Sequence, residues 1–183
     1  MSKLSATLFI AAVVVVGCSK ANNASDTSSA EHSAAAPAPA TTTATFDGVG
    51  RARIGSTTAQ LREVGAVPAA TGADACRIVA LDWLPAGTRV MLVNDTLVRV
   101  DMDSTSTVRT VDGAAVGDSE PHILQLYGKV ETQAHKYDPQ GRYLIVASPN
   151  DSTRRIIFET DGKTVRRYRV GRRPEVDYVE GCG

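Results

Sequence analysis

Residues 155–170 read RIIFETDGKTVRRYRV, and this stretch decides the predicted fold. An apolar run, Ile156–Phe158, is followed by Asp161-Gly162 and then by Thr164–Val170, which mixes β-branched, aromatic and charged residues. Asp-Gly between two such runs is typical of the tight turn of a β-hairpin. The stretch therefore predicts two antiparallel strands joined by a short loop.

A second hairpin is predicted upstream, from Arg89–Val93 and Leu97–Met102 around Asn94-Asp95. Apolar and charged residues alternate along the second of these runs, which is the period of a half-buried strand. The residues around the two turns also correspond in sequence. This correspondence is the first sign of an internal repeat.

Each hairpin follows a matching helical segment. Residues 53–64 and 115–126 both contain a β-branched residue, a glycine, a run of capping residues and then apolar positions spaced by three. Helices are predicted at 57–64 and 120–127, and their N-terminal caps are expected among Ser56, Thr57, Asp118 and Ser119. Single strands are predicted at 77–81, 143–147 and 176–179.

Helix, strand and hairpin, occurring twice, predict an α+β fold made of two diverged repeats. We expect an antiparallel sheet with short helices on one face. The alternative is a single β-sandwich with minor helices.

The motifs that carry the repeat resemble a known group of domains. Ile-Gly-x-x-x-x-x-Leu over 54–61 and Phe-x-x-Asp-Gly-Lys over 158–163 are similar to the small α/β modules of outer-membrane barrel-assembly lipoproteins and of β-lactamase-inhibitor protein. The second of these proteins carries two modules in tandem. The resemblance implies a fold and transfers no functional residue, because one fold hosts many functions.

The N-terminus resembles a bacterial lipoprotein leader. Leu4–Val16 is an apolar run of signal-peptide size, and Val15-Val16-Gly17-Cys18 resembles the lipobox. The resemblance implies that residues 1–17 are removed and that Cys18 receives acyl chains. Ser19 in place of Asp implies the outer membrane, facing the periplasm, in a cell with two membranes. The alternatives are an ordinary cleaved signal peptide or a buried cysteine.

Residues 18–45 are predicted to be the lipidated cysteine and a disordered tether. The segment after Cys18 consists almost wholly of Ala, Ser, Thr, Asn and Pro and shows no apolar period. Residues 46–183 are then expected to form a single α+β domain.

Cys76 and Cys182 remain once Cys18 is lipidated. Two cysteines in an oxidising envelope compartment are expected to form a disulfide. The alternative is two unpaired thiols.

Composition excludes several classes of function. The chain has 183 residues with 20 basic and 20 acidic side chains, and a neutral total argues against a general nucleic-acid binder. His122 and His135 lack partners at metal-ligand spacing, so no metal or other cofactor is predicted. Ser119 is interpreted as a helix cap rather than a nucleophile. No catalytic motif was found, and a non-enzymatic protein is predicted.

The neutral total hides an uneven charge distribution. From 154 to 173 there are eight cations and two anions, whereas 94–120 holds six anions and two cations. The candidate binding residues are Arg166, Arg167, Arg169, Arg172, Arg173 and Trp83. Arginine suits paired hydrogen bonds with carboxylate or phosphate. The alternative for the arginines is that they pair with acids within the fold or protect a sheet edge. The alternative for Trp83 is a place in the core.

The sequence thus predicts a membrane-anchored envelope lipoprotein whose domain is a non-catalytic binding or scaffolding module. The expected partners are the membrane, through Cys18, and an acidic envelope protein or anionic glycan. The alternative is an inhibitor or a lipoprotein that binds glycan or a small ligand. An envelope enzyme is the third possibility.

Overall fold

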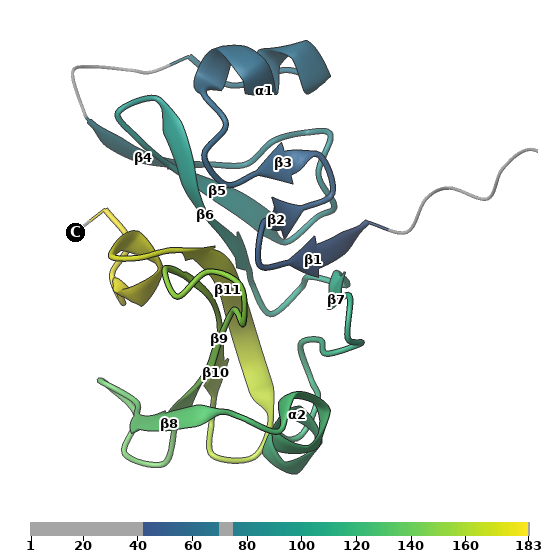
Figure 1. Ribbon diagram of the computed structural model, residues 1–183, viewed down its shortest axis with the longest axis vertical. Helices are drawn as coiled ribbons and strands as arrows, with labels where there is room; N and C mark the ends of the chain where they lie inside the picture. The colour runs from purple at the N-terminus through teal and green to yellow at the C-terminus, as the bar shows by residue number, and fades with distance from the viewer. Residues whose placement is uncertain (1–41, 70–74, 183) are drawn as a thin grey trace, which may run out of the picture. The chain divides into compact units, whose positions relative to one another are not determined.

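The computed structural model describes residues 42–69 and 75–182 (Figure 1). Two α-helices, two β-sheets and one short 3-10 helix make up this part of the chain, so the predicted α+β class is confirmed. The predicted leader and Cys18 lie outside the described residues.

The larger sheet has seven antiparallel strands in the order β4-β5-β6-β11-β10-β9-β8. Its strands are β4 (Cys76–Val79), β5 (Thr88–Val93), β6 (Thr96–Met102), β8 (Glu131–Ala134), β9 (Arg142–Ala147), β10 (Arg154–Thr160) and β11 (Val165–Arg172). The strands β6 and β11 pair at its centre, so the two hairpins meet there. Asn94 and Asp95 both have positive φ, as a two-residue hairpin turn requires.

The smaller sheet was not expected. It runs β3-β2-β1-β7 and is made of β1 (Thr43–Thr45), β2 (Gly48–Val49), β3 (Ala52–Arg53) and β7 (Arg109–Thr110). Ala44 is fully buried, so the folded structure includes residues before Phe46, the expected start of the domain.

Both helices begin at capped residues. The helix α1 (Thr58–Val64) starts with a capping box, in which Thr57 Oγ1 accepts from Gln60 N–H at 3.2 Å and Gln60 Oε1 accepts from Thr57 N–H at 2.9 Å. The helix α2 (Glu120–Tyr127) starts at Ser119, whose Oγ accepts from His122 N–H at 3.3 Å. Thr57 and Ser119 are therefore the caps among the residues considered.

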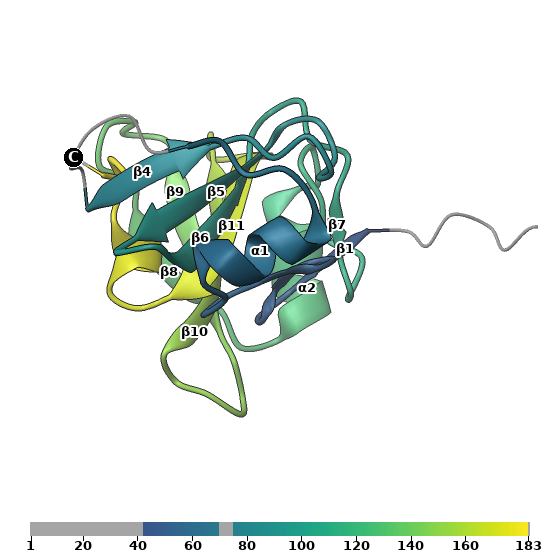
Figure 2. The same cartoon turned by 90° about the horizontal axis from the view of Figure 1, so that it is seen from above.

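The helices and the small sheet cover one face of the large sheet (Figure 2). Leu61 of α1 and Ile123 of α2 are buried there in the main hydrophobic core together with Ala44, Phe158 and Tyr168. We call this the helix face. A smaller apolar cluster of Tyr143, Ile145, Ile157 and Val176 lies on the opposite face.

The predicted strand at 176–179 is wrong. The chain instead forms a 3-10 helix, η1 (Glu175–Asp177), in which Asp177 N–H donates to Pro174 O at 3.0 Å and Tyr178 N–H to Glu175 O at 3.3 Å. The backbone is bonded locally, and Val176 is fully buried against the sheet. We call residues 173–182 the C-terminal strap, and the face beneath it the strap face.

Candidate functional site

The candidate arginines lie on β11 and at its end. Arg167 and Arg169 point to the strap face, whereas Tyr168 between them is buried in the main core. The pairing of β10 with β11 shifts by one residue next to Glu159, and this irregularity leaves Arg166 out of the alternation. The Arg166 and Arg167 side chains are 64% and 59% exposed.

A buried carboxylate, Glu159, lies at the centre of the site. Its side chain is 3% exposed and forms an ion pair with Arg167 Nε, while Arg169 Nη1 lies 3.5 Å from its Oε1. His135 Nε2 lies 3.7 Å from the same oxygen. This charge explains why two arginines converge here, since a buried carboxylate requires paired cations.

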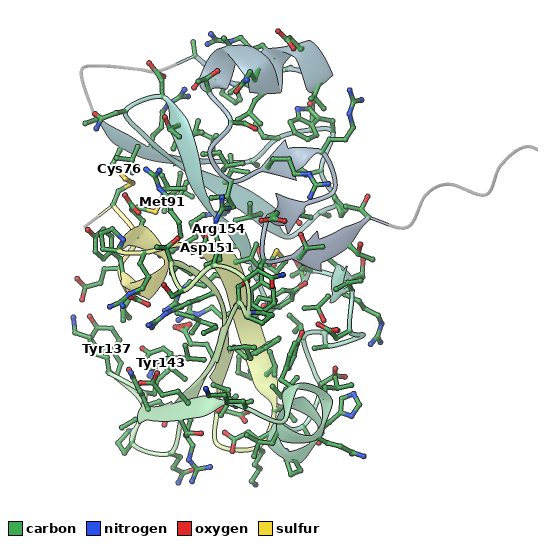
Figure 3. The ribbon with its side chains drawn as sticks, viewed as in Figure 1. Cys76, Met91, Tyr137, Tyr143, Asp151 and Arg154 are labelled. Atoms are coloured by element: carbon green, nitrogen blue, oxygen red, sulfur yellow. A yellow bond between two sulfur atoms is a disulfide. The ribbon has the colours of Figure 1, made fainter. Side chains whose placement is uncertain are left out.

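His135 presents an N–H to Glu159. Its Nδ1 accepts hydrogen bonds from the backbone N–H groups of Tyr137 and Asp138 at 3.1 and 3.0 Å, so the ring proton is on Nε2. The ring stacks on Tyr143, with 4.7 Å between centroids. Tyr137 and Tyr143 both lie on the side of the sheet away from α2 (Figure 3).

Arg169 belongs to the interior and is not a surface residue, which corrects its proposed place in a docking surface. The residue is 5% exposed, and its Nε donates to Val176 O of the strap at 2.6 Å. Its guanidinium lies over the Tyr143 ring, 5.6 Å from the centroid. Burial lowers the pKa of Arg169, and the Glu159 carboxylate opposes that effect.

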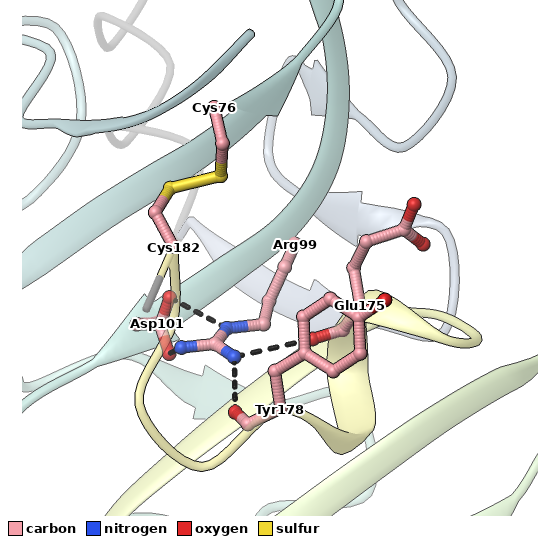
Figure 4. Close-up of a disulfide and its surroundings, with 6 residues drawn as sticks. All are labelled: Cys76, Arg99, Asp101, Glu175, Tyr178 and Cys182. Carbon is pink, nitrogen blue, oxygen red and sulfur yellow. Dashed lines mark hydrogen bonds and ion pairs between the residues drawn. A yellow bond between two sulfur atoms is a disulfide. The ribbon is translucent and has the colours of Figure 1, made fainter. Parts of the chain in front are cut away.

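Arg99 of β6 holds the strap in the same way (Figure 4). It forms an ion pair with Asp101, with Nη2 2.9 Å from Oδ1. Its Nη1 donates to the carbonyls of Glu175 and Tyr178 at 3.2 and 2.6 Å. Two buried guanidinium groups therefore bond the backbone of the strap.

Arg172 and Arg173 pair with acids of the strap. Arg172 Nε is 3.6 Å from Glu175 Oε2, and Arg173 Nε is 2.8 Å from Asp177 Oδ2. Both side chains stay partly exposed. Most of the cationic charge counted in the sequence is therefore paired within the fold.

Trp83 lies apart from the arginines. It is partly buried against the main core, and its Nε1 donates to Ala66 O at 3.1 Å. A Cβ added to Gly65 would lie 2.2 Å from Trp83 Cδ1, so the indole fits directly against that backbone. The structure thus places Trp83 beside the end of α1.

The expected pairing of Cys76 with Cys182 is present, with 5.6 Å between the Cα atoms. The disulfide joins β4 to the end of the strap across 106 residues of sequence.

Two shallow pockets on the strap face share Arg167, Glu159 and Asp103. One, of about 330 Å³, extends to Arg89 and Arg99, and the other, of about 320 Å³, extends to His135 and Arg166. Cations and anions alternate around both, so the surface offers hydrogen-bond donors and acceptors in close succession. Arg89, Glu159 and His135 were missed in the sequence. Glu159 lies opposite Arg167 because the pairing shifts between Glu159 and Thr160, and the Asp161-Gly162 turn gave no signal of that shift.

Within residues 42–69 and 75–182, no group of three or more His, Cys, Asp or Glu side chains is arranged to hold a metal ion. None of the helices in this part of the chain is long and apolar enough to cross a membrane. No protein-family model, curated protein or solved structure matches the chain. The functional argument therefore depends on the residues themselves.

Proposed function

We propose that this protein is a bacterial lipoprotein, anchored by acyl chains on Cys18, whose folded region is a non-catalytic binding or scaffolding module. The apolar run Leu4–Val16 and the lipobox-like residues 15–18 support the anchor. Several acyl chains give stable membrane attachment, whereas one gives only marginal binding. Ser19 favours the outer membrane, facing the periplasm, if the cell has two membranes.

The exposure of Arg166 and Arg167 is the observation that carries the binding role. Both project from a hairpin whose position is fixed by the central strands. Glu159 engages Arg167 through Nε, and Asp161 Oδ2 lies 4.0 Å from Arg166 Nη1, but both arginine side chains remain more than half exposed. Two adjacent guanidinium groups on a rigid support suit the carboxylates of an acidic protein partner.

Cross-linking of the full, oxidised chain to envelope extracts in mild detergent tests this proposal. We expect an acidic protein cross-linked near 161–173, retained by Arg62→Glu on α1 and lost by Arg166→Glu. Arg62 is an exposed arginine in the last turn of its helix, so Arg62→Glu makes the same change in charge as Arg166→Glu at a different site. Equal capture by the two variants would remove the arginine hairpin from the proposal.

A glycan or small polar ligand is the second candidate. The alternation of arginine and carboxylate around the two pockets of the strap face favours it, because hydroxyl groups both donate and accept. Titration with soluble envelope glycans, monitored by amide NMR shifts, would place such a ligand near Asp103 and Arg167. An inhibitor would act through the same face and would reduce the activity of a secreted enzyme in proportion to dose.

We also propose that the fold arose from two diverged helix–hairpin repeats. Matching hydrogen bonds support this. Gly55 N–H donates to Leu97 O at 2.7 Å, and Leu97 N–H returns to Ser56 O at 2.9 Å. In the second half, Gly117 N–H donates to Val165 O and Val165 N–H to Asp118 O, both at 2.8 Å. In each half, the segment before the helix is tied to the hairpin turn.

A further inference from the structure

The strand β8 is an open edge of the seven-stranded sheet. Among the described residues it pairs with β9 alone, and all four of its side chains are exposed. The strand contains no proline or lysine, the residues that often protect a sheet edge. Its outer side is therefore accessible to another strand.

The direction of the backbone groups follows from the pairing with β9. His135 N–H donates to Gly141 O at 3.1 Å, just beyond the last residue of the strand. Because hydrogen-bonded pairs alternate in an antiparallel ladder, Gln133 and Glu131 also face β9. The N–H and C=O groups of Thr132 and Ala134 then point outward.

Two pockets border this edge on the helix face. The first, of about 430 Å³, lies next to Thr132 and Ala134, and its charged lining is Arg142, Lys163 and Asp161. Asp161 accepts hydrogen bonds from the backbone of Lys163 and Thr164, and these bonds hold its pKa below the ordinary value. Arg142 is already paired with Glu120, at 2.6 Å between Nη1 and Oε2, so Lys163 is the cation of this lining that can attract an acidic side chain.

The second pocket, of about 660 Å³, lies beyond Glu131, between the end of α2 and β9. Its apolar lining includes Phe46, Leu126, Tyr127 and Val146, and the charged residues Asp112, Lys129, Glu131 and Arg155 also line it. The strand β9 continues for two residues past its last pair with β8, which leaves the sheet open here. This pocket suits a large apolar side chain.

We propose that an extended peptide segment of a partner protein adds to the sheet beside β8, with acidic side chains over the first pocket and a large apolar side chain in the second. Backbone pairing supplies affinity in such strand addition, and pockets for alternate side chains supply specificity. A peptide that runs antiparallel to β8 passes the first pocket, at Ala134 and Thr132, before it reaches the second pocket, beyond Glu131. The surface follows the β8 edge and shares only the turn residues 161–163 with the arginine hairpin, so this binding goes beyond the function proposed above.

The probe is a blocked peptide, Thr-Glu-Thr-Glu-Thr-Phe-Thr, in which both glutamates and the phenylalanine share one face of a strand. The control peptide, Thr-Glu-Thr-Glu-Phe-Thr-Thr, has the same composition and moves phenylalanine to the other face. With the full chain, we expect slowed hydrogen exchange at the Thr132 and Ala134 amides with the first peptide. Weaker protection is expected with the second.

Two variants sharpen the test. Lys163→Glu should weaken binding about tenfold by replacing attraction with repulsion, whereas Arg62→Glu should not. Thr132→Pro removes an outward N–H and should abolish protection, while Thr132→Ala should bind as the native chain does. Circular dichroism verifies the fold of each variant.

Three results would overturn the inference. The first is equal protection by both peptides, and the second is protection at other strands only. The third is a concentration-dependent dimer in ultracentrifugation that Thr132→Pro abolishes and the peptide does not compete with. That last result would assign the edge to a second copy of the chain.

Discussion

Arg167 and Arg169 lie two residues apart on β11 and reach the same carboxylate, yet their surroundings differ. Arg167 is mostly in water, whereas Arg169 is covered by the strap. The contact of Arg167 with Glu159 was not predictable, because a two-residue Asp161-Gly162 turn would place Thr164 opposite Glu159 and only the shift in register brings Arg167 there. The burial of Arg169 was not predictable either, because its cover comes from a segment that resembled a strand in sequence.

Removing Arg169 should therefore destabilise the protein. Arg169→Ala leaves Glu159 with less compensation and Val176 O without its donor, at an expected cost of about 3 kcal/mol. Arg166→Ala, at an exposed position, should change the free energy of unfolding by less than about 0.5 kcal/mol. Urea denaturation measures both, and equal effects would contradict the assignment of Arg169 to the interior.

The carboxylate of Asp103 has a pH-dependent role. Thr105 donates to it through its hydroxyl and its backbone N–H, at 2.6 and 2.8 Å, and these bonds lower the pKa of Asp103. A carboxyl group whose pKa is lower in the folded state stabilises the fold above its unfolded pKa, and this contribution is lost as pH falls through the folded value. NMR titration should show the pKa of Asp103 rising toward its ordinary value in Thr105→Val.

At the scale of elements, the helix caps could be predicted from the sequence, because they depend only on neighbouring residues. The long helices and strands could be predicted, because an alternation or capping pattern can be recognised only over several positions. The strands of two or three residues in the small sheet have no period, and β8 contains no large apolar residue. The open edge at β8 and the two pockets beside it could not be predicted from the sequence for the same reason.

The caps give a direct comparison. Ser119→Ala should lower the free energy of unfolding by about 1 kcal/mol, because a helix N–H loses its acceptor. Ser56→Ala should have a much smaller effect, since Thr57 is the cap of α1. Thermal denaturation of the two variants separates these cases, and a larger loss for Ser56→Ala would refute the assignment.

At the scale of the molecule, the disulfide and the two buried arginines close the strap face together. The disulfide joins distant segments, and cross-linking two such positions limits the unfolded ensemble. Cys76→Ser/Cys182→Ser should cost about 3–5 kcal/mol in the chain-entropy model. Denaturation in urea compares the double variant with the oxidised chain, and a difference below about 1 kcal/mol would show that the arginines suffice.

Membrane attachment is predicted to depend on one residue at the other end. Cys18→Ser should remove the acyl mass and leave the leader uncleaved, if the lipobox-like segment is processed as proposed. Intact mass measures both effects. A variant at Ser19 that keeps Cys18 should retain the acyl mass, which separates modification from sorting.

The strap also has a consequence for timing. The carbonyls that accept from Arg99 belong to residues 76 and 79 positions further along the chain. Translation at about 5–20 residues per second delivers them seconds after Arg99 itself. Throughout that interval Asp101 is the only partner of Arg99 named above that has been synthesised, so the last part of the chain completes the burial of the guanidinium group.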